Sequence, residues 1–164
     1  MCGCNKNKAP VLLERLLASV PGQPPAAPPI PTVDTSIWGA SMWKVLHIAA
    51  LYNEKLSQWR VILQSLLTDL PCPDCRAHYA EWYNSHPLKS GLIPRRFRRQ
   101  VIIWLFDLHN AINLRTGRPV WTIAQLDAAY SIDQLQDAKN TLDTLQGIIG
   151  QSAWDALHYL LHRL

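Results

Sequence analysis

The fold is decided by residues 59–79, which read WRVILQSLLTDLPCPDCRAHY. Apolar residues recur at helical spacing from Trp59 to Leu70, so this part is expected to form an amphipathic helix. Pro71 ends that helix, because proline lacks a backbone donor and clashes with the preceding turn. Pro73 suits the first turn of a new helix, which places a Cys-x-x-Cys motif at the junction. The inward face of the new helix is expected to carry Cys75, His78, Tyr79 and Trp82.

Helical spacing continues on both sides of this stretch, and no segment alternates apolar and polar residues as a strand does. A helix is expected over residues 38–50, and a long helix over residues 97–112 is closed by Gly117 and Pro119. The expected fold class is therefore all-α. It is a four-helix bundle with a short fifth helix, and it occupies residues 36–130.

The short fifth helix and a helical C-terminal extension over residues 131–164 are expected from helix-start signals. Three pairs of residues have the spacing of such a signal: Thr122 with Gln125, Ser131 with Gln134, and Ser152 with Asp155. The fifth helix is expected to end at Tyr130. Gly147 and Gly150 are expected to interrupt the extension.

Residues 1–35 differ in composition and are expected to form a flexible, proline-rich arm. Six of the 12 prolines lie between positions 21 and 31, which favours an extended polyproline II spacer of about 34 Å. A short helix is expected over residues 11–19, and Cys2 and Cys4 lie at the tip. Four cysteines in two close pairs exclude a disulfide-dense secreted scaffold but leave redox chemistry and metal binding open.

Charge and hydropathy favour a soluble protein. The net charge is +4, and the arginines at 95–96 and 98–99 are typical of a solvated first turn of a helix. The apolar residues 11–20 are too few to span a bilayer and include Glu14 and Arg15. No signal-peptide pattern is present. Neither nucleic acid nor a membrane is expected as a partner.

The Cys-x-x-Cys motif favours redox chemistry, because amides at a helix start stabilise a thiolate. A c-type haem site needs histidine directly after the second cysteine, where this chain has Arg76. A zinc site using Cys72, Cys75 and His78 lacks a fourth ligand at a standard spacing. A thioredoxin fold needs strands around the motif, whereas its flanks are helical. A redox dithiol in a helical bundle is the interpretation that remains.

Two of the expected helices carry aromatic and polar residues one turn apart, on one stripe of each helix. They are Gly39, Trp43 and His47 on the first helix and His109, Asn110 and Asn113 on the fourth, with Trp121 after the next turn. Gly39 permits a close approach, the indole offers a ring for stacking, and the histidines and amides offer hydrogen bonds. Such a set fits a pocket for a large planar cofactor.

Three motifs occur in order along the body: W-x-x-L-H at 43–47, C-x-x-C-x-x-H at 72–78 and H-N-x-x-N at 109–113. On these motifs the chain resembles the Erv/ALR family of FAD-linked sulfhydryl oxidases, over about residues 36–130. The resemblance implies a helical bundle that binds FAD non-covalently in its mouth, commonly as a homodimer. The compact layout is similar to that of members encoded by large DNA viruses.

The resemblance also implies roles for single residues. Cys75 would lie against the flavin, and Cys72 would be the exposed partner that exchanges with thiols. The residues that match cofactor contacts are Trp43, His47, Tyr52, His78, His109, Asn110 and Asn113. Contacts to the pyrophosphate or the adenine would come from Arg118, Trp121 and either Arg95 or Arg99.

The chain departs from the family pattern in two places. Asn53-Glu54 stands where the family often has a proline, which would reshape one wall of the pocket. No cysteine follows Cys75, so the second, structural disulfide of many members is absent. Packing must supply that stabilisation, with the tail at 131–164 as a candidate source.

The expected reaction is oxidation of dithiols by O₂ to a disulfide and H₂O₂, with electrons passing through Cys72–Cys75 and FAD. The expected substrates are thiol-containing proteins or a thioredoxin-like carrier, and Cys2 and Cys4 would act as a shuttle disulfide. A cytoplasmic location, in a host cell or a virion, is expected rather than the mitochondrial intermembrane space. A non-enzymatic helical adaptor and a zinc-binding module are the alternatives.

Overall fold

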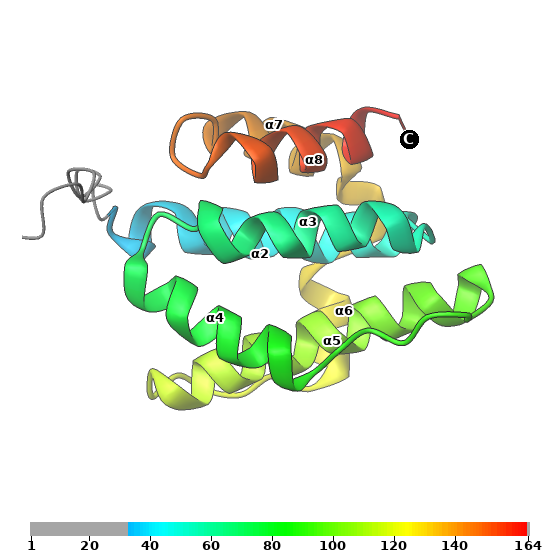
Figure 1. The fold of residues 1–164 in the computed structure, drawn as a ribbon, viewed down its shortest axis with the longest axis horizontal. Helices are drawn as coiled ribbons and strands as arrows, with labels where there is room; N and C mark the ends of the chain where they lie inside the picture. Colours follow the sequence, from blue (N-terminus) through cyan, green and yellow to red (C-terminus); the bar gives the residue numbers. More distant parts are fainter. Residues whose placement is uncertain (1–32, 164) are drawn as a thin grey trace, which may run out of the picture.

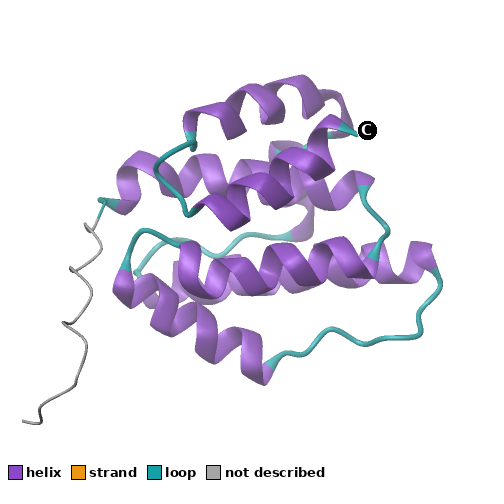
Figure 2. Cartoon of the chain, turned by 45° about the horizontal axis from the view of Figure 1, so that its top comes forward, coloured by secondary structure: helices purple, strands orange, loops and turns teal. Residues whose placement is uncertain are grey.

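A computed structural model describes residues 33–163, which form seven α-helices and one short 3₁₀ helix (Figure 1). Those residues contain no strand, which confirms the all-α prediction (Figure 2). The elements are α2 (Thr35–Tyr52), α3 (Leu56–Asp69), α4 (Pro73–Ser85), α5 (Pro94–Arg115), α6 (Ile123–Ala129), η1 (Ile132–Gln134), α7 (Leu135–Thr144) and α8 (Gln151–His162). The expected tip with Cys2 and Cys4, and the expected helix over residues 11–19, lie outside the described residues.

Figure 1 shows the helices in three layers. The middle layer is α2 and α3, with α7 and α8 covering one side and α4, α5 and α6 on the other. The close pairings are α7 on α2 and α8 on α3 on the first side, and α5 on α2 and α4 on α3 on the second. The extension therefore adds a full layer to the predicted bundle.

The core runs through the middle layer and into the extension. Trp59 and Ile62 of α3 and Ile48 of α2 are completely buried there. The extension contributes Ala138, Leu142, Leu145, Ile149, Ala153, Leu157, Leu160 and Leu161, each at most 4% exposed. Burying a large aliphatic side chain is worth about 1.5–3 kcal/mol. The extension is thus held by the same apolar core as the bundle.

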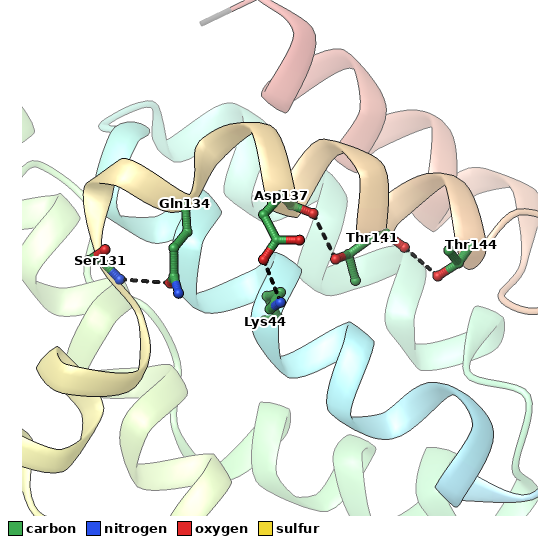
Figure 3. Close-up of polar contacts among 6 residues, drawn as sticks. All are labelled: Lys44, Ser131, Gln134, Asp137, Thr141 and Thr144. Atoms are coloured by element: carbon green, nitrogen blue, oxygen red, sulfur yellow. Dashed lines mark hydrogen bonds and ion pairs between the residues drawn. The ribbon is translucent and has the colours of Figure 1, made fainter.

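Two of the predicted helix starts are confirmed. Thr122 and Gln125 form a capping box at α6, in which each side chain bonds the other's backbone. Ser131 and Gln134 form a second box at η1, directly before α7 (Figure 3). These caps involve residues three apart, so the local sequence is sufficient to encode them.

The prediction that Ser152 and Asp155 open the last helix is wrong. Gly150 caps the start of α8, and Ser152 lies inside its first turn. The side chain of Asp69, at the end of α3, accepts a hydrogen bond from the Ala153 N–H at 2.7 Å. The Gly150 N–H donates to the Asp69 carbonyl at 2.8 Å. The cap comes from a distant residue because α8 packs on α3.

The predicted inward face of α4 is only partly correct. Tyr79 is buried, and its hydroxyl donates to the carbonyl of Leu63 at 2.8 Å. Cys75 and Trp82 are half-buried, whereas His78 is exposed. The reason is that the α4 backbone lies close to α3 and farther from α5, which Tyr79 and Trp82 reach through their rings at Trp104. The open face of α4 carries His78, one of the predicted cofactor contacts.

Candidate functional site

A disulfide joins Cys72 and Cys75 at the start of α4, with a Cα–Cα distance of 5.1 Å. Cys72 is the N-cap, and its sulfur accepts a hydrogen bond from the Cys75 N–H at 3.1 Å. Pro73 occupies the first turn, where its missing N–H costs nothing. Both cysteines are half-buried. The helix start thus presents a reducible bond with an amide already directed at the Cys72 sulfur.

This arrangement favours thiolate chemistry when the bond opens. Amides at a helix N-terminus and the helix dipole stabilise negative charge, which makes a cysteine there a good leaving group. The Cys75 amide supplies that stabilisation to Cys72. The two cysteines are buried to a similar extent, so the assignment of Cys72 to thiol exchange and of Cys75 to the cofactor rests on the resemblance.

Five rings from α2, α5 and the segment around α6 stack against one another, and we call them the ring cluster. Its members are Trp43, His47, His109, Trp121 and Tyr130. The Trp43 and His109 rings are 4.1 Å apart and within 5° of parallel. The Tyr130 ring stacks on His47 at 4.7 Å, and the Trp121 ring lies 5.2 Å from His109. Flat faces of this kind suit a planar ligand.

The two histidines of the ring cluster form a buried hydrogen bond, with 3.1 Å between His47 Nε2 and His109 Nδ1. Burial, and to a smaller degree the neighbouring His109, lower the pKa of His47 to about 3. Burial and the positive charge of Arg118 lower the pKa of His109 to about 4. Both rings are therefore neutral at pH 7, and one donates its N–H to the other.

Two asparagines on α5 support the cluster in different ways. Asn110 accepts from the Trp121 N–H at 2.8 Å and donates to its carbonyl at 2.9 Å, which ties the segment after α5 back onto that helix. Asn113 is buried, 4% exposed, and its side chain makes no hydrogen bond within the described residues. The Asn113 carbonyl accepts from the Arg118 N–H at 2.8 Å, which closes the turn after α5.

Six of the predicted cofactor contacts are neither members of the ring cluster nor the two asparagines beside it: Gly39, Tyr52, His78, Arg95, Arg99 and Arg118. Tyr52 donates its hydroxyl to the carbonyl of Ile132. Gly39 has open space where a Cβ would stand, so no described protein atom requires glycine there. Arg95 and Arg99 are exposed in the first two turns of α5, about 21 Å and about 15 Å along its axis from His109.

His78 lines a cavity of about 260 Å³ between α4 and α5, with Trp82, Ile112 and Arg115 among its other walls. The cavity lies on the stripe of α4 that continues from Cys75 through His78 to Trp82. The Trp82 indole N–H is buried and has no hydrogen-bond partner among the described residues. An unsatisfied buried donor beside a cavity is a feature that a bound polar ligand would relieve.

These residues fit a flavin nucleotide. The ring cluster offers flat faces, Asn113 and Trp82 offer unused polar groups, and Arg118 offers a cation for a phosphate. The described residues contain no group of three or more His, Cys, Asp or Glu side chains placed to hold a metal ion. No helix of the described part is long and apolar enough to cross a membrane.

Sequence reasoning missed Tyr130, which belongs to the ring cluster. The sequence pattern predicts Tyr130 only as the end of the fifth helix. The signal was an aromatic residue at the end of a short capped helix, with a second aromatic, Trp121, just before that helix. Its partner His47 is 83 positions away, so spacing along the chain does not reveal the stack.

A protein-family model described as Erv1 / Alr family matches residues 40–131, more than half of the chain. The chain is similar to a putative FAD-linked sulfhydryl oxidase of invertebrate iridescent virus 3, with 31% identity over 94 residues. It is similar to a probable FAD-linked sulfhydryl oxidase of Acanthamoeba polyphaga mimivirus, with 30% identity over 91 residues. These matches cover 54% and 52% of this chain, and 62% of each relative's length.

A third similarity is longer. A putative FAD-linked sulfhydryl oxidase of frog virus 3 is 27% identical over 142 residues, which cover 81% of this chain and 87% of that protein. The three motifs quoted above, at 43–47 and 109–113 and around the disulfide, all lie inside the family match.

Proposed function

The chain belongs to the Erv1/Alr family, and on that premise we propose that it is a FAD-linked sulfhydryl oxidase. The observation that carries the proposal is the Cys72–Cys75 disulfide capping α4 within the region of the family match. The overall reaction would convert two thiols and one O₂ into a disulfide and one H₂O₂. Thiol-containing proteins or a thioredoxin-like carrier are the proposed substrates.

Thiol exchange at the disulfide needs two steps. A substrate thiolate attacks the Cys72 sulfur, which forms a mixed disulfide and releases Cys75 as a thiolate. The second substrate thiolate then attacks the substrate sulfur of the mixed disulfide and releases Cys72. The Cys75 N–H, 3.1 Å from the Cys72 sulfur, stabilises that departing thiolate. The substrate leaves as a disulfide, and the two cysteines remain reduced.

The residues proposed to hold the cofactor are those of the ring cluster, Asn110, Asn113, Arg118 and His78, together with Gly39 and Tyr52. When bound, FAD would accept two electrons from the reduced cysteines and pass them to O₂. The neutral His47–His109 pair can bond to a ligand without adding charge to the site. Arg118 remains exposed and free to approach a phosphate.

The proposal is tested with the full chain, expressed in a host with ample flavin. We expect a yellow protein with a flavin spectrum that produces H₂O₂ when it oxidises dithiothreitol. Cys75→Ser should abolish peroxide formation and leave the flavin bound. A helical adaptor would be colourless and metal-free, and a zinc module would contain zinc. Either of those preparations would contradict the proposal.

We propose that Cys2 and Cys4 shuttle electrons from protein substrates to Cys72–Cys75. Glycine between two cysteines allows the tight ring of a Cys-x-Cys disulfide, and such rings are oxidising. Changing both cysteines to serine should slow the oxidation of a protein dithiol and leave dithiothreitol oxidation unchanged. If the double substitution changes the oxidation of both substrates to the same extent, a shuttle is contradicted.

A homodimer is also proposed, because the resemblance implies one. The α7–α8 layer covers one side of the middle layer, so a second copy would not contact α2 and α3 directly on that side. Light scattering on the purified full chain measures the mass directly.

A cytoplasmic place of action, in a host cell or a virion, is proposed on the similarity to the viral relatives.

A further inference from the structure

The segment from Trp121 to Tyr130 forms one wall of the ring cluster but has little packing of its own. Its helix, α6, packs closely on none of the other described helices. Leu126 is the one buried residue of α6, and it lies outside the main core. A seven-residue helix is also too short to be stable alone. Apart from the buried Leu126 side chain, the contacts that position this wall lie at its two ends, and we call the segment the α6 strap.

The N-terminal end of the strap is fixed inside the bundle. Asn110 of α5 both donates to and accepts from the backbone of Trp121, at 2.9 and 2.8 Å. A side-chain amide that pairs both groups of one peptide unit holds that residue in position and orientation. This end belongs to the part of the chain covered by the family match.

The C-terminal end of the strap is fixed by the extension. Directly after Tyr130, the Ser131–Gln134 box turns the chain into α7 (Figure 3). The Tyr52 hydroxyl at the end of α2 donates to the carbonyl of Ile132. Further along, Lys44 of α2 forms an ion pair with Asp137 of α7 at 2.6 Å (Figure 3). Lys44 directly follows Trp43, a member of the ring cluster.

The extension itself is firmly attached, which makes it a suitable anchor. Leu142 of α7 and Leu157 of α8 are completely buried in the shared core. The Trp154 indole N–H donates to the Leu142 carbonyl at 3.1 Å, which joins the two helices of the extension. The extension begins where the family match ends, at residue 131.

We propose that the C-terminal extension is a positioning element of the cofactor site, because it holds the α6 strap and thereby keeps Tyr130 stacked on His47. The link to FAD rests on the proposed function. The mechanical coupling between extension and strap does not. A loosened anchor would free Tyr130 and open the wall that the strap provides.

The test inserts Gly-Ser-Gly between Gln134 and Leu135 in the full chain, which loosens the link between α7 and the strap and changes no residue of the ring cluster. The matched control inserts the same residues between Gln146 and Gly147, in the exposed turn between α7 and α8. Hydrogen exchange in the flavin-free chain reports on the strap through the Leu126 and Tyr130 amides, which donate within α6. FAD affinity is measured by titration of flavin fluorescence.

We expect the first insertion to speed exchange at these amides at least tenfold over the control, and to raise the Kd for FAD at least tenfold. Equal strap exchange in the two insertion variants would overturn the coupling. Faster exchange with an unchanged Kd would overturn the role in cofactor binding. If the parent chain binds no FAD, the proposed function fails while the exchange result still decides the coupling.

Tyr52→Phe provides a second, milder variant, should the insertion prevent folding. It removes only the hydroxyl that reaches Ile132. Exchange at the Tyr130 amide should rise several-fold in the flavin-free chain, with a melting temperature close to that of the parent. A lower melting temperature with unchanged exchange in the strap would assign Tyr52 a general structural role and overturn the coupling.

Discussion

Acidification should destabilise the flavin-free chain through the buried histidine pair, and His47→Gln should remove much of that effect. The unfolded chain takes up a proton at His47 near pH 6.5, whereas the folded chain does so only near pH 3. Between these values the unfolded state binds more protons, so stability falls as the pH falls. The group contributes no pH dependence above about pH 7.5.

The magnitude follows from the two pKa values. At pH 5, proton uptake by the unfolded imidazole favours unfolding by a factor of about 30, which is about 2 kcal/mol. His109, with its pKa near 4, adds a second contribution of the same sign. Against a total stability of about 5–15 kcal/mol, a loss of this size is readily measured.

The assay is urea unfolding followed by far-ultraviolet circular dichroism at pH 7.5, 6.5 and 5.0. The free energy of unfolding of the parent should drop by about 2 kcal/mol more than that of His47→Gln over this range. The comparison concerns the pH dependence, because the variant will also lose stability at every pH. His162→Gln, at the exposed end of α8, is the matched control and should follow the parent. Parallel curves for the parent and His47→Gln would refute the reasoning.

Four other substitutions test the packing and the place of Gly39. Leu157→Ala, in the completely buried part of α8, should cost about 2–5 kcal/mol in urea unfolding. Leu114→Ala, at a position 73% exposed, should change stability by less than about 0.5 kcal/mol. Gly150→Ala places a methyl group against the Asp69 side chain, so it should cost about 1–3 kcal/mol and speed exchange at the start of α8. Gly39→Ala meets open space and should stabilise the flavin-free chain by about 0.5–1 kcal/mol. If the flavin approaches Gly39 closely, the same variant will bind FAD more weakly; unchanged affinity would remove Gly39 from the site.

The local part of the site could be predicted because its signals span only a few residues. Pro71 and Pro73 mark the end of one helix and the start of the next, where Cys72 is the N-cap and Cys75 lies in the first turn. The spacing of His109 and Asn113 identifies a polar stripe on one helix. Roles assigned to these residues came from the resemblance, because spacing alone also allowed a metal site.

The remaining features needed the tertiary structure. Asp69 caps α8 from another helix, and Tyr130 reaches His47 across the bundle. The exposure of His78 depends on the distance between α5 and α4. The hydrophobic periodicity of the sequence does not predict that distance. Contacts of this kind join residues far apart in the chain, so their geometry appears only when the helices are packed.

The sequence by itself determined the all-α class, the order of the main helices to within about three residues at their ends, two of three expected helix starts and the placing of a Cys-x-x-Cys motif at a helix N-terminus. These depend on hydrophobic periodicity, proline geometry and caps, which act over one or two turns. Only the tertiary structure decided that the extension becomes a third layer, that two histidines share a buried hydrogen bond and lose their basicity, and that α6 is held from both ends. The burial of the extension, the desolvation of the two histidines and the anchoring of α6 all depend on which helix surfaces pack together and exclude water.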